Sequence, residues 1–155
     1  MTPATLDHAG IAALIPHRGP MCLLERMTSW SASSIACTAV NHRDPRHPLR
    51  SASGLLASAT IEYAAQAMAL HGALCAAGEG QLAGPGVLAS ARDVRLACWR
   101  LDDLPVADPD VLVVRAERHA ADGERILYGF AVRHGGRELA SGRVTVVLDA
   151  VAKAR

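Results

Sequence analysis

The amino-acid sequence predicts an α+β domain in which an antiparallel sheet of about six strands is wrapped around one long central helix. The segment 55–77 consists almost wholly of small and apolar residues, so a helix formed there must be covered on most of its sides. Strand-like runs stand before and after this segment, but strands and helices do not alternate along the chain. This order argues against a doubly wound parallel sheet, and a sheet curled around the helix is one way to bury it.

The first half of the chain should contain a short helix, two strands, a loop and the beginning of the long helix. These elements are expected at residues 7–15, 21–30, 33–41, 41–53 and from about 55 onward. Pro16 stops the first helix, because proline disrupts a helix interior. Ser53 is in position to cap the long helix, and the Gly78-Glu79-Gly80 cluster is expected to end it.

The second half should be antiparallel sheet, with strands over residues 87–101, 111–120, 126–134 and 137–148. The first of these strands is long enough to be bent or bulged. Asp122-Gly123 and Gly135-Gly136 separate the later runs and are typical of hairpin turns. A sheet curled around a central helix is the hot-dog fold, and its open edges favour pairing with a second subunit.

All 155 residues are expected to form a single hot-dog domain, with disordered ends at 1–6 and 150–155. Half of the residues are hydrophobic, which is enough for a sizeable core. The net charge is only +1 with histidine neutral, and aromatic residues make up 3%. This composition indicates no strong attraction to nucleic acid or to an anionic membrane.

The four cysteines are scattered and include no Cys-x-x-Cys pair, which disfavours both a zinc site and a disulfide framework. They are Cys22, Cys37, Cys75 and Cys98. We expect them to be reduced, buried thiols of a cytoplasmic protein. The first 15 residues lack the basic segment and apolar core of a secretion signal.

The segment 55–77 is long enough to span a bilayer, but three polar side chains argue against insertion. Glu62, Gln66 and His71 lie inside it, and each would be costly in the hydrocarbon region. We therefore expect a core helix. Glu62 is its most informative residue, because a carboxylate among small apolar neighbours marks either a reactive site or a structural hydrogen-bond network. Gln66 lies one helical turn further on and is placed to orient it.

Three segments carry a resemblance to a known family. They are residues 14–26, which contain Pro16-His17-Arg18, residues 61–67, which contain Glu62 and Gln66, and residues 89–95. These segments resemble the hot-dog β-hydroxyacyl-acyl-carrier-protein dehydratases of fatty-acid synthesis. The wording of the second segment is closest to a divergent branch found with aryl-polyene gene clusters. The resemblance implies dehydration of 3-hydroxyacyl chains to 2-enoyl thioesters, without a metal or diffusible cofactor.

The resemblance also implies a site built from an acid on the central helix and a histidine in the preceding loop, contributed by different subunits. Glu62 matches the acid, and His47 stands 15 positions before it. The family's Gly-His-Phe-Pro wording is absent around His47, the spacing differs by one residue, and the Pro-Gly at the helix start is missing. Ala57 and Ser58 stand near the position where the family's backbone amide polarises the thioester, and Gly54 comes earlier in the chain. With Gln66, Gly54 and Ser58 are the expected substrate-binding residues.

Dehydration of this kind needs a base for the α-proton and an acid for the departing hydroxide. A carboxyl group in an apolar pocket can remain protonated and donate, whereas a neutral imidazole can accept. We therefore expect Glu62 as the acid and His47 as the base, with His17 as the rival base and His42 as an outside candidate. The plainer interpretations stay open: His47 as an ordinary loop histidine, and Glu62 as part of a structural network.

Partners follow from the same interpretation. A basic set can meet an acyl carrier protein or the phosphate of its phosphopantetheine, although solvated arginines paired with nearby aspartates explain it equally well. The set consists of Arg43, Arg46, Arg50, Arg92, Arg95 and Arg100. The leading hypothesis is a homodimeric dehydratase or a higher even oligomer. The alternatives are a non-catalytic acyl-binding hot-dog subunit paired with an active dehydratase, and an acyl-CoA thioesterase.

Overall fold

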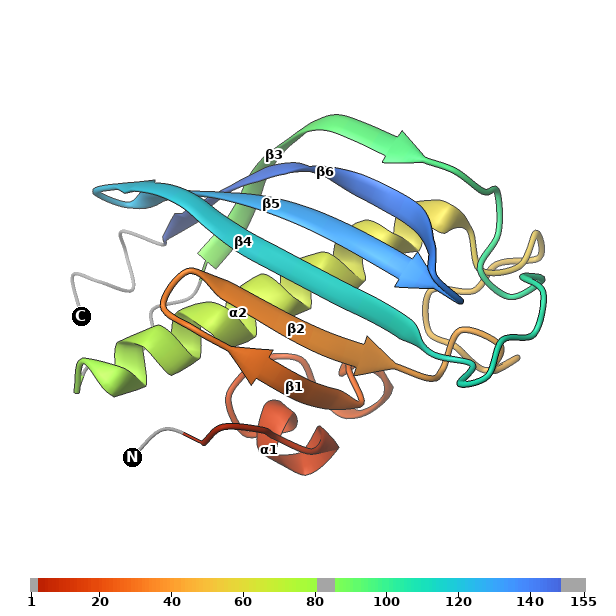
Figure 1. The fold of residues 1–155 in the computed structure, drawn as a ribbon, viewed down its shortest axis with the longest axis horizontal. Helices are drawn as coiled ribbons and strands as arrows, with labels where there is room; N and C mark the ends of the chain where they lie inside the picture. Colours follow the sequence, from red (N-terminus) through yellow and green to blue (C-terminus); the bar gives the residue numbers. More distant parts are fainter. Residues whose placement is uncertain (1–2, 81–85, 149–155) are drawn as a thin grey trace.

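A computed structural model of the chain, describing residues 3–80 and 86–148, confirms the predicted fold class. One antiparallel sheet has the strand order β1-β2-β4-β5-β6-β3 and curves around helix α2 (Thr60–Gly78), as Figure 1 shows. The strands are β1 (Arg26–Trp30), β2 (Ser34–Ala39), β3 (Gly86–Leu96), β4 (Leu112–Asp122), β5 (Arg125–His134) and β6 (Arg137–Leu148).

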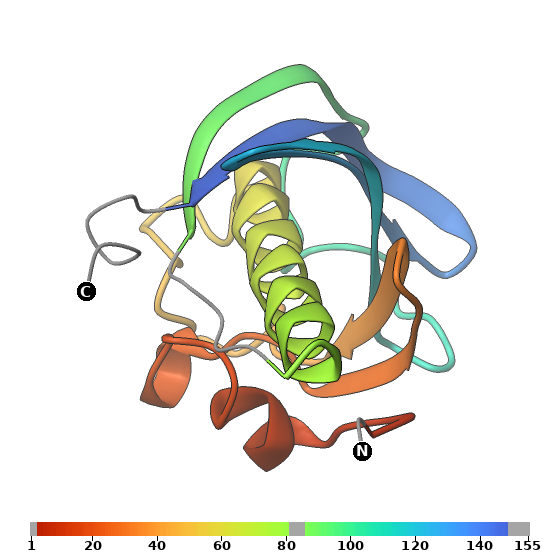
Figure 2. The same ribbon diagram turned by 90° about the vertical axis from the view of Figure 1, so that its left-hand side faces the viewer.

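Helix α2 is the centre of the core. The sheet arches over it, and the N-terminal segment with helix α1 (His8–Ala12) lies on the side that the sheet leaves open (Figure 2). The side chains of Tyr63, Leu70 and Leu74 are at most 1% exposed. Because the sheet and the N-terminal segment cover the helix on several sides, nearly every face of it needs an apolar or small residue, and the helix has no polar stripe.

The N-terminal segment is more irregular than expected. Asp7 caps helix α1 by accepting the Gly10 N–H at 2.9 Å, and the helix ends at Ala12, well before Pro16. Strand β1 begins only at Arg26, because the stretch before it is a short 3₁₀ turn followed by extended chain. Leu6 pairs with Met27 through two backbone hydrogen bonds, so it belongs to the ordered fold, although it was expected in a disordered end. Residues 150–155 lie outside the described residues.

The start of the long helix corrects the prediction that Ser53 caps it. A 3₁₀ turn, Ala57–Ala59, leads into the helix, the N-cap position is Ala59, and no side chain caps it. Ser53 instead donates its N–H to Ser51. The end of the helix is as predicted, since Gly78 is its last residue.

The predicted hairpins are confirmed. Strands β4 and β5 turn at Asp122-Gly123 and pair so that Leu112 lies opposite His134. Strand β3 ends at Leu96, shorter than expected, and its pairing with β6 shifts register twice, so the predicted bend is real. Leu101 no longer belongs to the strand, and its N–H bonds to the carbonyl of Leu55 before the helix. At the end of the strand order, β3 is an open edge with a mostly exposed surface.

Two cysteines correct the expectation of four buried thiols. Cys22 and Cys37 are buried, but Cys75 and Cys98 are partly exposed. All four are free thiols. No helix within the described ranges is both long and apolar enough to cross a membrane.

A buried histidine ties the helix to strand β5 and to the turn between β1 and β2. His71 is fully buried, with Nδ1 at 2.8 Å from the Tyr128 hydroxyl and Nε2 at 2.8 Å from the Ser31 carbonyl. Because a carbonyl only accepts, Nε2 carries the proton and Nδ1 accepts from the tyrosine. We predict that Tyr128→Phe lowers the free energy of unfolding by about 1–3 kcal/mol, because it leaves the buried Nδ1 of His71 without a hydrogen-bond donor. Urea denaturation measures this loss, and a change near zero would contradict the assigned bond.

Three buried histidines make the stability of the fold depend on pH. Burial lowers the pKa of His42, His47 and His71, so the folded state keeps them neutral after the unfolded chain has begun to bind protons at about pH 6.5. Below that pH the unfolded state binds more protons than the folded state, so stability falls as pH falls. We expect the melting temperature to drop between about pH 7 and about pH 5. A flat profile there would contradict this burial.

Candidate active site

Glu62 stands in the first turn of α2 and is less buried than its sequence context predicted. Its side chain is 35% exposed in the single chain, which corrects the expectation of a buried acid. Oε1 accepts a hydrogen bond from Nε2 of Gln66 at 3.1 Å, and Nε2 of His17 lies 3.3 Å from the same oxygen. Oε2 has no hydrogen bond with any residue in 3–80 or 86–148. One carboxylate oxygen is therefore held in place, and the other is neither buried nor hydrogen-bonded within the described residues.

Gln66 holds this carboxylate in position. It is fully buried, its Oε1 accepts the Leu23 N–H at 2.9 Å, and its Nε2 donates to the Met21 carbonyl at 2.7 Å as well as to Glu62. All its polar groups are thus used within the chain, which suits a positioning residue better than one that contacts substrate. The same bonds join the helix to the extended segment that follows Pro16-His17-Arg18.

His17 is the imidazole that the fold brings to Glu62. Its side chain is 25% exposed, and Nε2 faces the carboxylate. Nδ1 is buried and has no hydrogen-bond partner in the described part of the chain. The pairing depends on the Pro16-His17-Arg18 opening crossing the start of α2, a tertiary contact between segments far apart in the sequence.

His47 lies elsewhere and bonds to other groups. Its Nε2 is 2.9 Å from the Tyr63 hydroxyl, and its Nδ1 accepts the Leu49 N–H at 3.1 Å. The Tyr63 hydroxyl in turn donates to Oδ1 of Asn41 at 2.5 Å. His47 is 5% exposed, and burial lowers its pKa. Among the described contacts of this chain, none joins His47 to Glu62.

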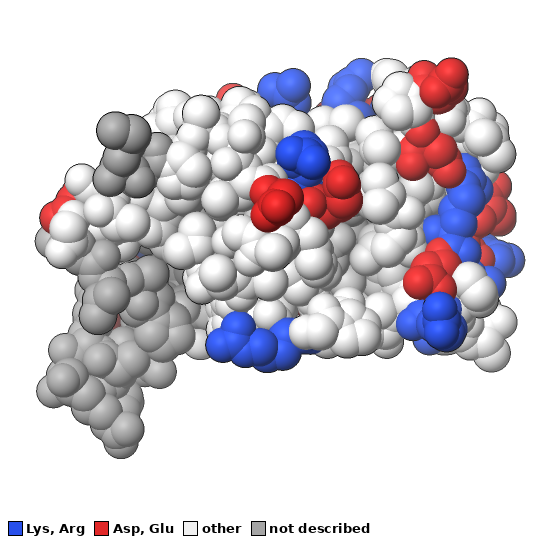
Figure 3. Space-filling model, turned by 90° about the horizontal axis from the view of Figure 1, so that it is seen from below, with Lys and Arg blue, Asp and Glu red and all other residues white. Residues whose placement is uncertain are grey.

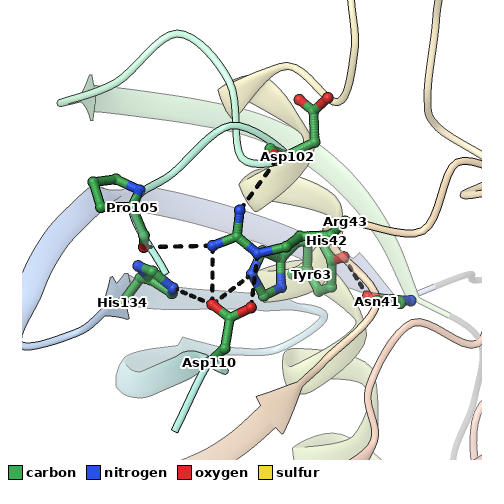
Figure 4. A network of polar contacts seen from close by, with 8 residues as sticks. All are labelled: Asn41, His42, Arg43, Tyr63, Asp102, Pro105, Asp110 and His134. Carbon is green, nitrogen blue, oxygen red and sulfur yellow. Dashed lines mark hydrogen bonds and ion pairs between the residues drawn. The ribbon is translucent and has the colours of Figure 1, made fainter. Parts of the chain in front are cut away.

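A second polar cluster, centred on Asp110, was not predicted. His42, Arg43 and His134 all point at its carboxylate (Figure 4). Oδ1 lies 3.3 Å from His42 Nε2 and 2.7 Å from His134 Nε2, and Arg43 donates to Oδ2 at 2.7 Å. These contacts hold the pKa of the Asp110 carboxyl well below its usual range, with the Arg43 bond as the largest cause. The cluster fastens the loop that carries His47 to the ends of β4 and β5.

The Asp110 cluster contains side chains of the types that bind metal cations, but it also contains the positive charge of Arg43. The ligand atoms of His42, Asp110 and His134 lie within 4.8 Å of one another. However, Arg43 also donates to Oδ1 at 3.0 Å, so its guanidinium contacts both carboxylate oxygens. Arginine cannot lose its charge in proteins, so a divalent ion here would face a fixed neighbouring cation. We assign this cluster to structure.

Three of the six members of the predicted basic set are paired with carboxylates in the described part of the chain. Arg50 and Arg100 both meet Asp102, at 3.2 Å and 2.7 Å, and Arg43 meets Asp110. Figure 3 shows positive and negative side chains mixed at one end of the molecule, while much of the remaining face carries no charge. This intermixing matches the plainer interpretation of those three arginines as partners of nearby aspartates.

A groove of about 510 Å³ lies beside the start of α2 and the end of β3. Its lining is mostly apolar and consists of Leu56, Ala57, Ser58, Leu96, Ala97, Cys98 and Trp99. Ser58, expected to contact substrate, is exposed in this groove. Gly54 is not part of it: it is buried with φ +94°, and a Cβ there would lie 2.5 Å from the Arg100 guanidinium. Because Gly54 has no side chain, the Arg100 guanidinium can lie this close to its backbone.

Comparison with known proteins gives a family match over most of the chain. A family model described as ApeP-like, ApeP dehydratase, matches residues 9–154. Among curated proteins there is no significant match.

Solved structures give a consistent fold. The dehydratase heterocomplex ApeI:P from Xenorhabdus doucetiae superposes with a TM-score of 0.79 at 21% identity, covering 93% of this chain and 94% of that chain. A thioesterase from Haemophilus influenzae gives 0.64 at 14% identity, covering 93% and 91%. A hypothetical thioesterase with coenzyme A from Streptococcus pneumoniae gives 0.54 at 11%, covering 79% and 84%. At these identities the likeness is one of fold.

Proposed function

Because this chain belongs to the ApeP-like dehydratase family, we propose that it takes part in the dehydration of 3-hydroxyacyl thioesters carried on an acyl carrier protein. The product is the 2-enoyl thioester of a fatty-acid-like or polyene chain. The observation that carries the proposal is the state of Glu62, whose carboxyl group has one oxygen fixed by Gln66 and the other accessible and without a hydrogen bond in the described residues.

This arrangement suits a general acid. Oε1 accepts the Gln66 N–H, so a proton on the carboxyl group resides on Oε2, the oxygen available to a substrate. In the reaction, a base removes a proton from C2 of the acyl chain, the C2–C3 double bond forms, and the C3–O bond breaks. The Oε2 proton joins the departing hydroxide, and water leaves. General acid catalysis of this kind contributes about 10²–10⁴-fold to a rate.

The groove beside Glu62's helix is suited to hold the thioester. Ser58 stands in the turn before α2, where the partial positive charge of the helix N-terminus favours negative charge growing on a carbonyl oxygen. The apolar lining from Leu56 to Trp99 accepts the uncharged part of an acyl chain or pantetheine arm. The exposed Arg92 and Arg95 on β3 are the members of the basic set best placed to meet a phosphate or an acidic carrier.

A second hot-dog subunit is the partner that the open edge suits best. Trp99 is 89% exposed, and Leu56 and Leu96 are 43% and 44% exposed beside β3, whose outer edge pairs with no strand of the described residues. Such an edge with a large apolar neighbour is a site for strand pairing and burial. The structurally similar ApeI:P is a heterocomplex, which supports a different hot-dog chain as the partner in addition to a second copy of this one.

Trp99→Ser should weaken this association without disturbing the fold. Interfacial tryptophans contribute about 2 kcal/mol or more, which is roughly thirtyfold in Kd. Sedimentation velocity across a dilution series measures the change. Val106→Ser is the matched control, because Val106 is 83% exposed but lies outside the groove. Equal effects of the two substitutions would contradict the proposed interface.

The test of the function is to incubate the assembled protein with a 3-hydroxyacyl thioester and follow the enoyl product. Formation of the enoyl thioester supports the proposal. Release of free thiol would instead identify an acyl-CoA thioesterase; two structurally similar proteins are described as thioesterases. Absence of both, together with tight retention of acyl chain, would identify a non-catalytic acyl-binding subunit.

A further inference from the structure

The sheet has a second hollow, on the face turned away from α2, which the proposed reaction does not use. Figure 2 shows how the sheet arches over the helix and leaves its other face free. Along β4, Val114 and Ala116 are buried against the core, so Arg115 between them points outward. A furrow of about 440 Å³ lies on this outer face, and residues of β3, β4, β5 and β6 line it. We call it the outer furrow.

The register of the strands explains why the outer furrow is hollow. Ala131 on β5 lies between Arg115 on β4 and Ser141 on β6. In the neighbouring row, Gly129 on β5 lies beside Arg143 on β6. Because adjacent strands are about 4.8 Å apart, the walls on β4 and β6 stand about 10 Å from each other. Two long cationic side chains therefore flank a floor of very small ones.

Two arginines face each other directly at one wall of the furrow. Arg92 on β3 is paired in register with Arg143 on β6, so both lie on the outer face. Like charges directly opposite each other destabilise a sheet. Arg143 has a single ion pair within the described ranges, with the exposed Asp93 at 3.8 Å. An anion in the furrow would offset the repulsion between the two guanidinium groups.

Positive charge exceeds negative charge around the outer furrow. Arg115 forms no ion pair with any residue in 3–80 or 86–148, and the same is true of Arg92 and Arg95. With histidine neutral, four arginines and two carboxylates leave two positive charges uncompensated. The arginines are Arg92, Arg95, Arg115 and Arg143, and the carboxylates are Asp93 and Glu117.

We propose that the outer furrow binds a phosphate group between Arg115 and Arg143, with the Ser141 hydroxyl beneath it. Arginines on opposite walls need an anion that accepts hydrogen bonds on more than one side. A tetrahedral phosphate does so, whereas a carboxylate presents two oxygens along one edge, which a single guanidinium occupies. A phosphate dianion also matches the two uncompensated charges. None of the described residues lines both this furrow and the apolar groove beside α2, so the site is separate from the proposed reaction.

Isothermal titration calorimetry with inorganic phosphate, at an ionic strength fixed with sodium chloride, tests the site. We expect saturable binding of one phosphate per chain with a Kd of about 1 mM or lower. Arg115→Gln and Arg143→Gln should each weaken binding about tenfold or more, because each removes a charged donor. Asp93→Asn should instead tighten binding about two- to fivefold, because it removes the carboxylate that competes for Arg143.

Arg125→Gln is the matched control, because Arg125 is an exposed arginine of β5 that lies outside the furrow. It changes the net charge as much as Arg115→Gln and should leave the Kd unchanged. The substituted arginines are exposed, so circular dichroism should show an intact fold in each variant. Equal weakening by Arg125→Gln, titration without saturation, or tighter binding of acetate than of phosphate would overturn the proposal.

A second titration, with glycerol 3-phosphate, distinguishes the source of the phosphate group. Binding at least about tenfold tighter than that of inorganic phosphate identifies a phosphate ester as the occupant, and equal affinities identify free phosphate. Both results require the losses in Arg115→Gln and Arg143→Gln. If these two substitutions instead lower the sedimentation coefficient and no phosphate binds to the wild-type chain, the furrow is a protein contact and the inference is wrong.

Discussion

Glu62→Gln should reduce dehydration by about 10²–10⁴-fold while leaving the fold intact. The substitution keeps the shape of the side chain and an oxygen that can accept from Gln66, but it removes the proton that the departing hydroxide needs. The loss should appear in kcat, because the acid acts on the bond that breaks and contributes little to holding the rest of the substrate. Steady-state kinetics on a 3-hydroxyacyl thioester measure it.

The control for this substitution lies just after the end of the same helix. Glu79 follows the last residue of α2 and is exposed, so Glu79→Gln changes the net charge equally without touching the carboxyl group beside His17. Thermal denaturation should give similar melting temperatures for both variants. Full activity of Glu62→Gln, or equal losses in the two variants, would remove Glu62 from the chemistry.

Asp110→Ala should clearly destabilise the fold. It leaves Arg43, His42 and His134 without their shared acceptor, and two of these side chains are at most 6% exposed. Removing one partner of a buried charge network costs about 3–5 kcal/mol, and the 29% exposure of Asp110 reduces this to about 2–3 kcal/mol. Chemical denaturation at neutral pH measures the difference.

Asp103→Ala is the matched control for Asp110. Asp103 is 60% exposed and reaches Arg100 only at 3.8 Å, so its removal should cost little. Because the pKa of Asp110 is lower in the folded protein than in the unfolded chain, the stability that Asp110 contributes depends on pH. This contribution is fully present above the usual carboxyl pKa and is lost as the pH falls through the lower pKa of the folded state. If Asp110→Ala and Asp103→Ala are equally stable, the network carries no stabilisation.

The sequence was sufficient for the architecture because each element carries a local signal. The unbroken apolar character of 55–77 predicts a covered helix, and Asp122-Gly123 and Gly135-Gly136 fix the hairpins. Gln66 is also predictable as a support for Glu62, since residues four apart share a helix face. The ends of the helices and strands were harder to predict. At the start of α2, the 3₁₀ turn Ala57–Ala59 replaces a cap by Ser53, because backbone hydrogen bonds to Trp99 and Leu101 hold the chain that enters the helix.

The contacts of the histidines could not be predicted in the same way, because they join segments distant in sequence. Sequence spacing favoured His47 as the companion of Glu62, but its ring is occupied by Leu49 and Tyr63, and a crossing of the N-terminal segment brings His17 to Glu62 instead. Burial of Glu62 was overestimated because the apolar neighbours of a helix start need not cover its outward face.

One signal for the Asp110 cluster was present in the sequence. The hairpin turn at Asp122-Gly123 sets the register of β4 against β5, and counting outward from it brings His134 next to the residues that follow Asp110. The contribution of Arg43 to the same carboxylate depends on the path of the loop after β2, which no local pattern determines.

The most direct measurement is mass spectrometry of a carrier-bound 3-hydroxyacyl chain after incubation with the assembled complex. We expect a species lighter by one water, with the thioester intact, formed by the wild-type chain and not by Glu62→Gln. An unchanged 3-hydroxyacyl chain, or a free carrier thiol with released hydroxy acid, would contradict an acid positioned on α2 for the loss of water.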